Sequence, residues 1–174
     1  MEAEFLKIPK DRVGVVIGKG GETKRLVEQK AGVTLDVTHE GSVSIKSEDG
    51  LNLWKGRDVV KAIGRGFNPK FALNLSKEGY AFTIINLDEI FHGRESDIKR
   101  IKARVIGENG KARKTMETLS NSKISVYGKT VSIIAREEDM GPIEEALKMI
   151  MDGAHHAKVY KFLEGVHREK KLGL

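Results

Sequence analysis

Short stretches of alternating apolar and polar residues occur in both halves of the chain, and this alternation is typical of half-buried β-strands. The stretches cover residues 5–8, 33–37, 43–45, 81–85, 122–126 and 131–133. Apolar residues at helical spacing follow in residues 58–63 and 142–147, and a last helix is expected over residues 154–170. The pattern therefore predicts a chain that mixes short strands with amphipathic helices.

The two halves of the chain repeat one another. Residues 16–28 align with residues 105–117 at an offset of 89 positions, with identical valines, isoleucines and glycines at the start of each segment. Both segments contain Gly-x-x-Gly, at residues 18–21 and 107–110, followed by basic residues. Each half therefore predicts the order strand, helix, Gly-x-x-Gly turn, helix, strand, strand, helix.

This order of elements around a Gly-x-x-Gly turn resembles a type I KH domain. The resemblance implies an α+β fold of tandem type I KH domains (β-α-α-β-β-α each), with a three-stranded antiparallel sheet packed on three helices, plus a C-terminal helix. We place the first KH domain at residues 1–67, a linker at 68–79 and the second KH domain at 80–153. The C-terminal helix and tail then occupy residues 154–174.

The Gly-x-x-Gly turn explains how such a domain meets RNA. Glycine leaves the backbone uncovered, and the following helix offers unpaired N–H groups to a phosphate. KH modules clamp four nucleotides of a single strand in this way. Candidate RNA-binding residues in the first half are Gly18, Lys19, Gly20, Gly21, Lys24, Arg25, Leu35 and Val37. Candidates in the second half are Lys102, Arg104, Gly107, Glu108, Asn109, Gly110, Lys111, Arg113, Lys114 and Ile124.

The charge distribution supports a polyanionic partner only weakly. Lys and Arg outnumber Asp and Glu by 31 to 25, for a net charge of +6. Residues 99–114 contain seven basic residues and one acid, Glu108, although such a run also suits a solvated helix face. Because Lys19 lies at the first turn and Glu108 at the second, we expect the first copy to bind RNA through its turn. The second copy would then bind more through its basic flank.

Several other function classes find no support in the sequence. The chain has no cysteine, which excludes disulfides, cysteine zinc sites and cysteine nucleophiles. No apolar run approaches the roughly 20 residues of a membrane span, and the first residues lack the pattern of a secretory signal. No complete nucleotide-phosphate loop or catalytic constellation is found. We therefore expect a cytoplasmic protein that is not an enzyme, with no cofactor, metal, membrane or small-molecule substrate.

A chain filled by two KH domains resembles the archaeal members of the Partner of Nob family, which are small-subunit ribosome assembly factors. The resemblance covers residues 3–168 and rests on Ala-Leu-Asn-Leu at 72–75 and on the glycine and basic residues of 106–117. It implies binding of single-stranded small-subunit rRNA near its 3′ end. It also implies a Nob-type endonuclease and the pre-small subunit as partners. The intact first turn and the acidic Glu108 depart from the eukaryotic pattern, so the dominant KH domain stays open.

Two alternatives come from other classes of function. The chain could be a protein-interaction adaptor with degenerate KH domains, which docks through an apolar stripe on the last helix. That stripe consists of Val159, Leu163 and Val166, and packing on the second domain would also explain it. A metal-dependent nuclease would instead use Glu137, Glu138 and Asp139, although acidic residues at a helix start also complement the helix dipole.

Overall fold

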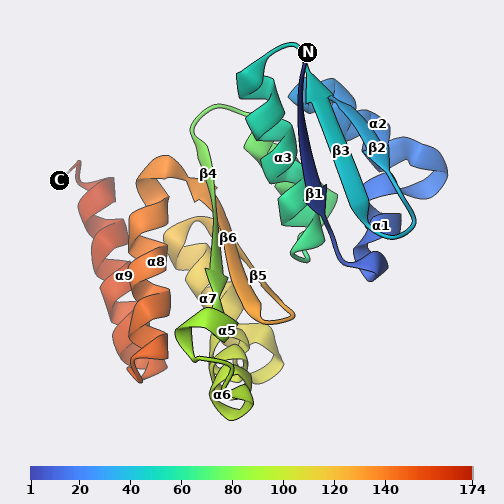
Figure 1. Ribbon diagram of the computed structural model, residues 1–174. Helices are drawn as coiled ribbons and strands as arrows, with labels where there is room; N and C mark the ends of the chain where they lie inside the picture. The colour runs from blue at the N-terminus through green and yellow to red at the C-terminus, as the bar shows by residue number, and fades with distance from the viewer. Residues whose placement is uncertain (174) are drawn as a thin grey trace. The chain divides into compact units, whose positions relative to one another are not determined.

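The computed structural model describes residues 1–173, and the chain divides into two compact units, Met1–Phe82 and Thr83–Leu174. In each unit, helices cover one face of a three-stranded antiparallel sheet (Figure 1). The predicted α+β organisation with a C-terminal helix is therefore confirmed. Within the described part of the chain, no helix combines the length and the apolar character needed to cross a membrane.

The first unit follows the predicted order of elements. Its elements in chain order are β1 (Glu2–Lys7), α1 (Lys10–Ile17), η1 (Lys19–Gly21), α2 (Glu22–Ala31), β2 (Thr34–Val37), β3 (Ser42–Ser47) and α3 (Gly50–Gly64). The sheet order is β1-β3-β2, so β1 and β2 are edge strands. Leu35 faces Ile45 across β2 and β3, and both side chains are buried under the helices. The alternation of the sequence thus places one face of each strand in the core.

The segment expected as a linker folds onto the first unit. It forms the short helices α4 (Pro69–Ala72) and η2 (Leu73–Ser76), which pack against α3. The Asn68 side chain caps α4 by accepting the Lys70 N–H at 2.9 Å. Ala72 and Leu75 are buried, and the burial of these two apolar side chains favours packing of the segment on α3. The division between the units falls at residues 82 and 83, inside β4 (Tyr80–Asn86), rather than at the ends of the segment.

The second unit repeats the order and adds two helices. Its remaining elements are α5 (Leu87–Ile90), α6 (Glu95–Ile106), η3 (Glu108–Gly110), α7 (Lys111–Ser120), β5 (Ser122–Tyr127), β6 (Thr130–Arg136), α8 (Glu137–Met151) and α9 (His156–Lys171). The sheet order is β4-β6-β5, which places β5 at an edge as β2 is in the first unit. The short helix α5 was not expected from the sequence; the Asn86 side chain caps it.

Helix α9 packs on α7 and α8 of its own unit (Figure 1). Val159 and Leu163 are 0% and 1% exposed, whereas Val166 is half-buried. Two of the three residues of the apolar stripe therefore form part of the core of the second unit. The stripe is therefore explained by packing on the second unit itself. The main sequence argument for a protein-interaction adaptor is thereby removed.

Candidate nucleic-acid interface

The two Gly-x-x-Gly turns adopt the same backbone conformation. Gly18 has φ 73° and ψ 173°, and Gly107 has φ 72° and ψ 176°. Two positions further into each turn, Gly20 and Asn109 both adopt left-handed angles, with φ 58° and φ 54°. Asparagine is one of the few side chains that tolerates this region, so the tip sequences differ without changing the backbone. The second turn is thus shaped to do what the first turn does.

Glycine is required at the first position of each turn for steric reasons. A Cβ atom on Gly18 would lie 2.3 Å from Thr23 Oγ1, and one on Gly107 would lie 2.5 Å from the Ala112 Cβ. At the tips the situation is different, because a Cβ on Gly20 would meet nothing within 4 Å. The first glycine therefore lets the chain turn tightly against the next helix, while the tip remains open to a ligand.

Both turns lead into a helix that begins without a side-chain cap. Helix α2 follows Gly21 and α7 follows Gly110, and each of these left-handed glycines is an N-cap that makes no side-chain cap hydrogen bond. The N–H groups of Glu22 and Lys111 donate back to the Lys19 and Glu108 carbonyl oxygens of the turns, and each helix start carries the positive end of the helix dipole. The open turn and the uncapped helix together form a place for an anion such as a phosphate.

The two turns have the same charged groups in opposite places: the cation and the carboxylate swap positions between the turn tip and the start of the next helix. Lys19 at the first tip corresponds to Glu108 at the second, and Glu22 at the start of α2 corresponds to Lys111 at the start of α7. All four side chains are exposed. Each turn therefore carries one cation and one carboxylate. Glu108 does not leave the second turn more acidic than the first, since Lys111 is only three residues away.

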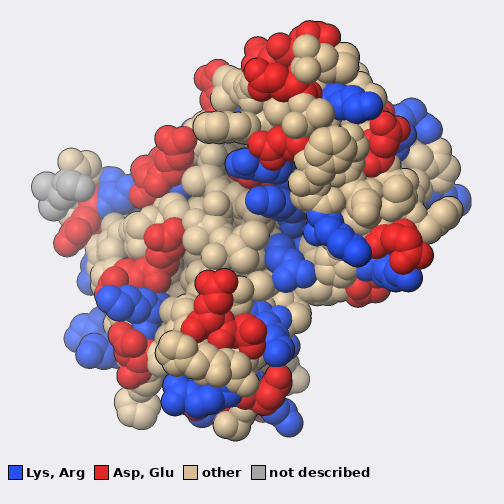
Figure 2. All heavy atoms as spheres, in the orientation of Figure 1, with Lys and Arg blue, Asp and Glu red and all other residues tan. Residues whose placement is uncertain are grey.

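The remaining basic residues of the turns differ in how far they are already engaged. Arg25 Nη1 donates to the Gly20 carbonyl oxygen at 2.9 Å, which ties an exposed guanidinium to the first turn. Arg113 Nη1 donates to Glu117 Oε1 at 3.2 Å, and Lys24 lies 3.9 Å from Glu28. On the face shown in Figure 2, basic and acidic side chains are interspersed over both units. Because neighbouring opposite charges and salt screen one another, each cation attracts a phosphate only at short range.

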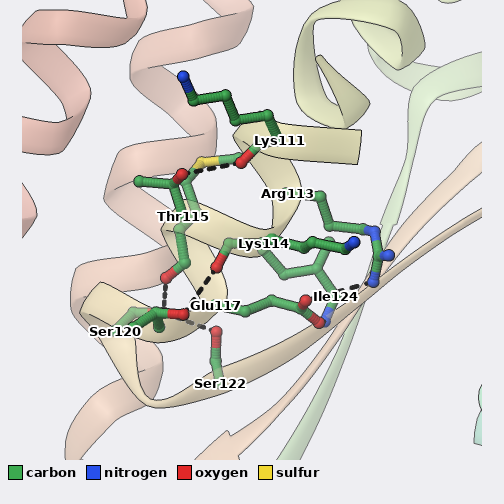
Figure 3. A network of polar contacts seen from close by, with 10 residues as sticks. Lys111, Arg113, Lys114, Thr115, Glu117, Ser120, Ser122 and Ile124 are labelled. Atoms are coloured by element: carbon green, nitrogen blue, oxygen red, sulfur yellow. Dashed lines mark hydrogen bonds and ion pairs between the residues drawn. The ribbon is translucent and has the colours of Figure 1, made fainter. Parts of the chain in front are cut away.

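A glutamate joins the second helix to the edge strand in each unit. Glu117 Oε2 accepts the N–H of Ile124 on β5 at 2.9 Å, as Figure 3 shows, and Glu28 Oε1 accepts the N–H of Leu35 on β2 at 2.9 Å. The sequence analysis did not single out these glutamates. The signal was present, because they are identical residues at aligned positions of the repeat.

The same hydrogen bonds show which backbone groups of the edge strand face outward. In an edge strand, alternate residues direct both N–H and C=O away from the sheet. Since the N–H of Leu35 reaches Glu28, the main-chain groups of Val37, two residues on, lie on the same outer edge. The N–H of Thr38 donates inward to Ser42, in agreement with this alternation. Val126 has the corresponding position after Ile124.

Residues 81–168 match the family model described as eukaryotic type KH domain (KH-domain type I), and residues 3–61 match the KH domain model. The chain belongs to the KH-domain family. A KH domain-containing protein of Methanocaldococcus jannaschii is 47% identical over 92% of this chain and 72% of its own length.

Two further similarities connect the chain with ribosomal RNA proteins. The pre-rRNA-processing protein pno1 of Aspergillus fumigatus is 29% identical over 68% of this chain and 48% of its own length. The crystal structure of an a/eIF2alpha–aDim2p–rRNA complex from Pyrococcus horikoshii OT3 matches with a TM-score of 0.88 and 39% identity. That match covers 97% of this chain and 95% of the other. The expected relationship to the Partner of Nob family is confirmed by these matches.

Burial corrects the expected roles of Leu35 and Ile124 in the two KH domains. Their side chains are 0% and 3% exposed, so they belong to the core and cannot line an open groove. What these residues present to the outer edge is their main chain. Val37 is half-buried and keeps both side chain and main chain near that edge. Val126 is its half-buried counterpart in the second domain.

Arg104 is the other expected binding residue whose role the structure corrects. Its guanidinium donates to the carbonyl oxygens of Ile150, at 2.7 Å, and of Ala154. It therefore caps the end of α8 instead of pointing at a ligand. Lys102 on the same helix is half-buried and Lys114 on α7 is exposed, so both are compatible with phosphate contact.

The first KH domain has an arginine with the same structural task. Arg12 Nε donates to the Ile63 carbonyl oxygen at 2.8 Å, and Nη2 donates to that of Phe67 at 2.9 Å. The acceptors are four residues apart, as in the second domain. Arg12 and Arg104 do not align in the repeat, and Arg104 lies about one helical turn further along its helix than the aligned position of Arg12. The packing of the helices, and not the position in the repeat, therefore decides which arginine donates to the carbonyl oxygens at the end of the last helix of each KH domain.

The acidic start of α8 does not have the arrangement of a nuclease site. Asp139 is buried and accepts from Lys170 Nζ at 2.6 Å. The pKa of the Glu138 carboxyl is lowered, first by a hydrogen bond to its own backbone N–H and then by Arg136. Among the residues that the structure describes, no group of three or more histidine, aspartate or glutamate side chains is placed to hold a metal ion. The acidic residues are explained by the helix start.

Proposed function

We propose that this protein binds single-stranded rRNA through both KH domains and serves as a non-catalytic assembly factor of the small ribosomal subunit. The observation that carries this proposal is the identical open conformation of the two Gly-x-x-Gly turns, each followed by an uncapped helix. The relatives agree, because one is named as a pre-rRNA-processing protein and another was crystallised with rRNA.

In the proposed binding mode, each domain receives about four nucleotides. Phosphates lie against the turns at Gly18–Gly21 and at Gly107–Gly110, where main-chain N–H groups and the helix dipole favour negative charge. Exposed cations such as Lys19 and Lys111 add local electrostatic attraction for the phosphates. Base edges meet the outward main-chain groups of the edge strand near Val37 and Val126. The protein supplies binding and orientation and carries out no chemical step.

The proposed target and setting extend those of the relatives. We assign the RNA to the 3′ region of small-subunit rRNA, within the pre-small subunit in the cytoplasm. A Nob-type endonuclease would be the protein partner, and this protein would hold the RNA strand that the endonuclease cleaves. The relatives' names support rRNA as the target, and the 3′ region, the cytoplasmic setting and the Nob-type partner are carried over from the resemblance to the Partner of Nob family.

Fluorescence anisotropy with a labelled strand of about 12 nucleotides tests the proposal, since two clamps of four nucleotides fit within it. The strand carries the 3′-terminal sequence of small-subunit rRNA, with a scrambled strand and a duplex beside it. The double variant Lys19→Asp/Gly20→Asp removes a cation and places carboxylates at the first tip. Asn109→Asp/Lys111→Asp does the same at the second. Lys158→Asp/Lys161→Gln on α9 changes the net charge by the same three units, at positions outside both turns.

We expect each turn variant to lose at least about 10-fold in affinity, and the α9 variant to lose much less at about 0.15 M salt. Circular dichroism melts establish that all variants fold. If the turn and α9 variants lose affinity equally, binding is non-specific and the turns are not clamps. If the native and scrambled strands bind equally, RNA binding stands but the 3′ target does not. Incubation with Mg²⁺ or Mn²⁺ should leave the labelled RNA intact, and specific cleavage would overturn the non-catalytic role.

A further inference from the structure

The first domain exposes large apolar side chains on strand β1 and on helix α3, which packs beside it. Phe5 on β1 is 78% exposed, Trp54 on α3 is 60% exposed and Leu51 is 57% exposed. Helix α3 runs alongside β1 in the same direction, since Gly50 lies near Glu2 and Gly64 lies against Ile8. The RNA-facing strand β2 is the opposite edge of this three-stranded sheet. The apolar group is therefore not explained by the proposed RNA site.

One side chain connects the strand with the helix. Arg57 Nη1 lies 3.4 Å from Glu4 Oε1 on β1, and its guanidinium carbon lies 5.7 Å from the Trp54 ring centroid. Asp58 follows on the helix at 3.4 Å from Arg57 Nε. Glu4, Arg57 and Asp58 thus form a row of alternating charge beside β1, and the Trp54 indole lies next to Arg57.

The backbone of β1 leaves a regular set of groups on its outer edge. The N–H of Ile8 donates inward to Gly41 at 2.8 Å, and by alternation Leu6 and Glu4 also face β3. Ala3, Phe5 and Lys7 therefore direct their N–H and C=O groups away from the sheet, and all three side chains are exposed. An exposed edge of this kind is a template for another strand.

We propose that this edge is a dimerisation surface, on which β1 of a second copy of the chain pairs antiparallel with β1. Phe5 is the middle one of the three residues whose main-chain groups point outward. A two-fold axis at Phe5 therefore pairs Phe5 of one chain with Phe5 of the other, and Ala3 of one chain with Lys7 of the other. This register uses every outward group of the three residues and makes about six main-chain hydrogen bonds. The two sheets become one continuous sheet, with the two phenylalanine rings adjacent on its outer face.

The helix beside the strand is self-complementary about the same axis. Arg57 is level with the centre of β1, because it reaches Glu4. An antiparallel copy of α3 therefore places Asp58 of one chain near Arg57 of the other, and Trp54 near Lys61. The opposed charges and the cation over the indole favour a second copy over an unrelated strand. Such an interface would also cover Leu51, Trp54 and Phe5 together.

Sedimentation velocity on the full chain, from about 5 µM to about 500 µM, tests the proposal, because isolated edge pairing is a weak association. We expect the mass to rise from 19.3 kDa toward twice that value with concentration. Phe5→Asp and Trp54→Ala should each weaken the association at least about 10-fold, since each removes apolar area that the second copy would cover. Ile90→Asp, at a 45% exposed position of α5, is the matched control and should dimerise like the wild type.

Amide hydrogen exchange locates the surface independently. The N–H of Phe5 should exchange more slowly as concentration rises, whereas that of Leu6, which faces β3, should not change. A mass of 19.3 kDa at every concentration would overturn the proposal. Dimerisation of Phe5→Asp with wild-type strength, or an unprotected Phe5 N–H in a dimer, would also overturn it. RNA affinity of the Phe5→Asp variant serves as a check of folding, because β2 and the turn lie outside the altered edge.

Discussion

Glu117 and Ile124 are joined by a hydrogen bond of 2.9 Å between a carboxylate oxygen of α7 and a main-chain N–H of β5. The glutamate also accepts from Arg113, and its side chain is 11% exposed. The same link joins Glu28 to Leu35 in the first domain, where the glutamate is 25% exposed. The link fixes the distance between the helix that starts at the turn and the edge strand of the sheet.

Replacing Glu117 by alanine should loosen the second domain. The Ile124 N–H would lose a charged acceptor in a nearly buried position, at a cost of about 2–3 kcal/mol in the free energy of unfolding. Glu117→Gln keeps an acceptor oxygen and should cost less. Hydrogen exchange at the Ile124 amide measures the effect directly. An amide that exchanges as slowly in Glu117→Ala as in the wild type would contradict the prediction.

The glycines of the first turn should respond very differently to substitution. Gly18→Ala forces a Cβ to within 2.3 Å of Thr23 Oγ1 at a positive φ, and we expect a loss of at least about 2 kcal/mol. Gly20→Asn should cost less than about 1 kcal/mol, because Asn109 already adopts that conformation in the other turn. Urea unfolding monitored by circular dichroism compares the two variants. Equal losses would show that the turn tolerates no side chain at either position.

Arg104 and Lys102 form a matched pair on α6 that separates stability from binding. Arg104→Ala leaves the carbonyl groups of Ile150 and Ala154 without their donor, and should lower the free energy of unfolding by about 2–3 kcal/mol. Lys102→Ala should change stability by less than about 0.5 kcal/mol and reduce RNA affinity a few-fold. Thermal melts and anisotropy titrations on both variants provide the two readouts. A stable Arg104→Ala with reduced RNA affinity would restore Arg104 as a binding residue.

Asp58 should make the first domain less stable as pH rises through the acidic range. Burial raises the pKa of this carboxyl above its ordinary value of 3.8, and the Arg57 guanidinium offsets part of that effect. Because the folded-state pKa is the higher one, the folded protein binds the proton more tightly, so stability is greater below 3.8 and declines through the raised pKa.

The variant Asp58→Asn removes this titration. It should flatten the dependence of Tm on pH between about 3.5 and 7 and raise Tm at neutral pH by on the order of 1 °C, a small effect because the carboxyl is partly exposed. Melts at low protein concentration keep self-association out of the comparison. A lower Tm at neutral pH would mean that the Arg57 ion pair outweighs the desolvation of the carboxylate.

Local sequence patterns were enough to predict the repeat, the order of elements and the two turns. These features follow from local rules: alternation makes strands, glycine permits left-handed turns, and aligned positions repeat the same conformation. Even the substitution of Asn109 for a glycine could be understood locally, since both residues accept a positive φ. The membership of the KH-domain family followed from the same local features.

The tertiary structure decided which side chains are free to act. Arg104 looked like a cation for phosphate, but it caps residues 46 and 50 positions away. Leu35 and Ile124 looked like groove residues, but the helices cover them. Glu28 and Glu117 gained a positioning role only when helix met strand. These outcomes depend on how elements dock across the chain, and residue type at one position contains no information on which distant carbonyl or strand edge will lie opposite.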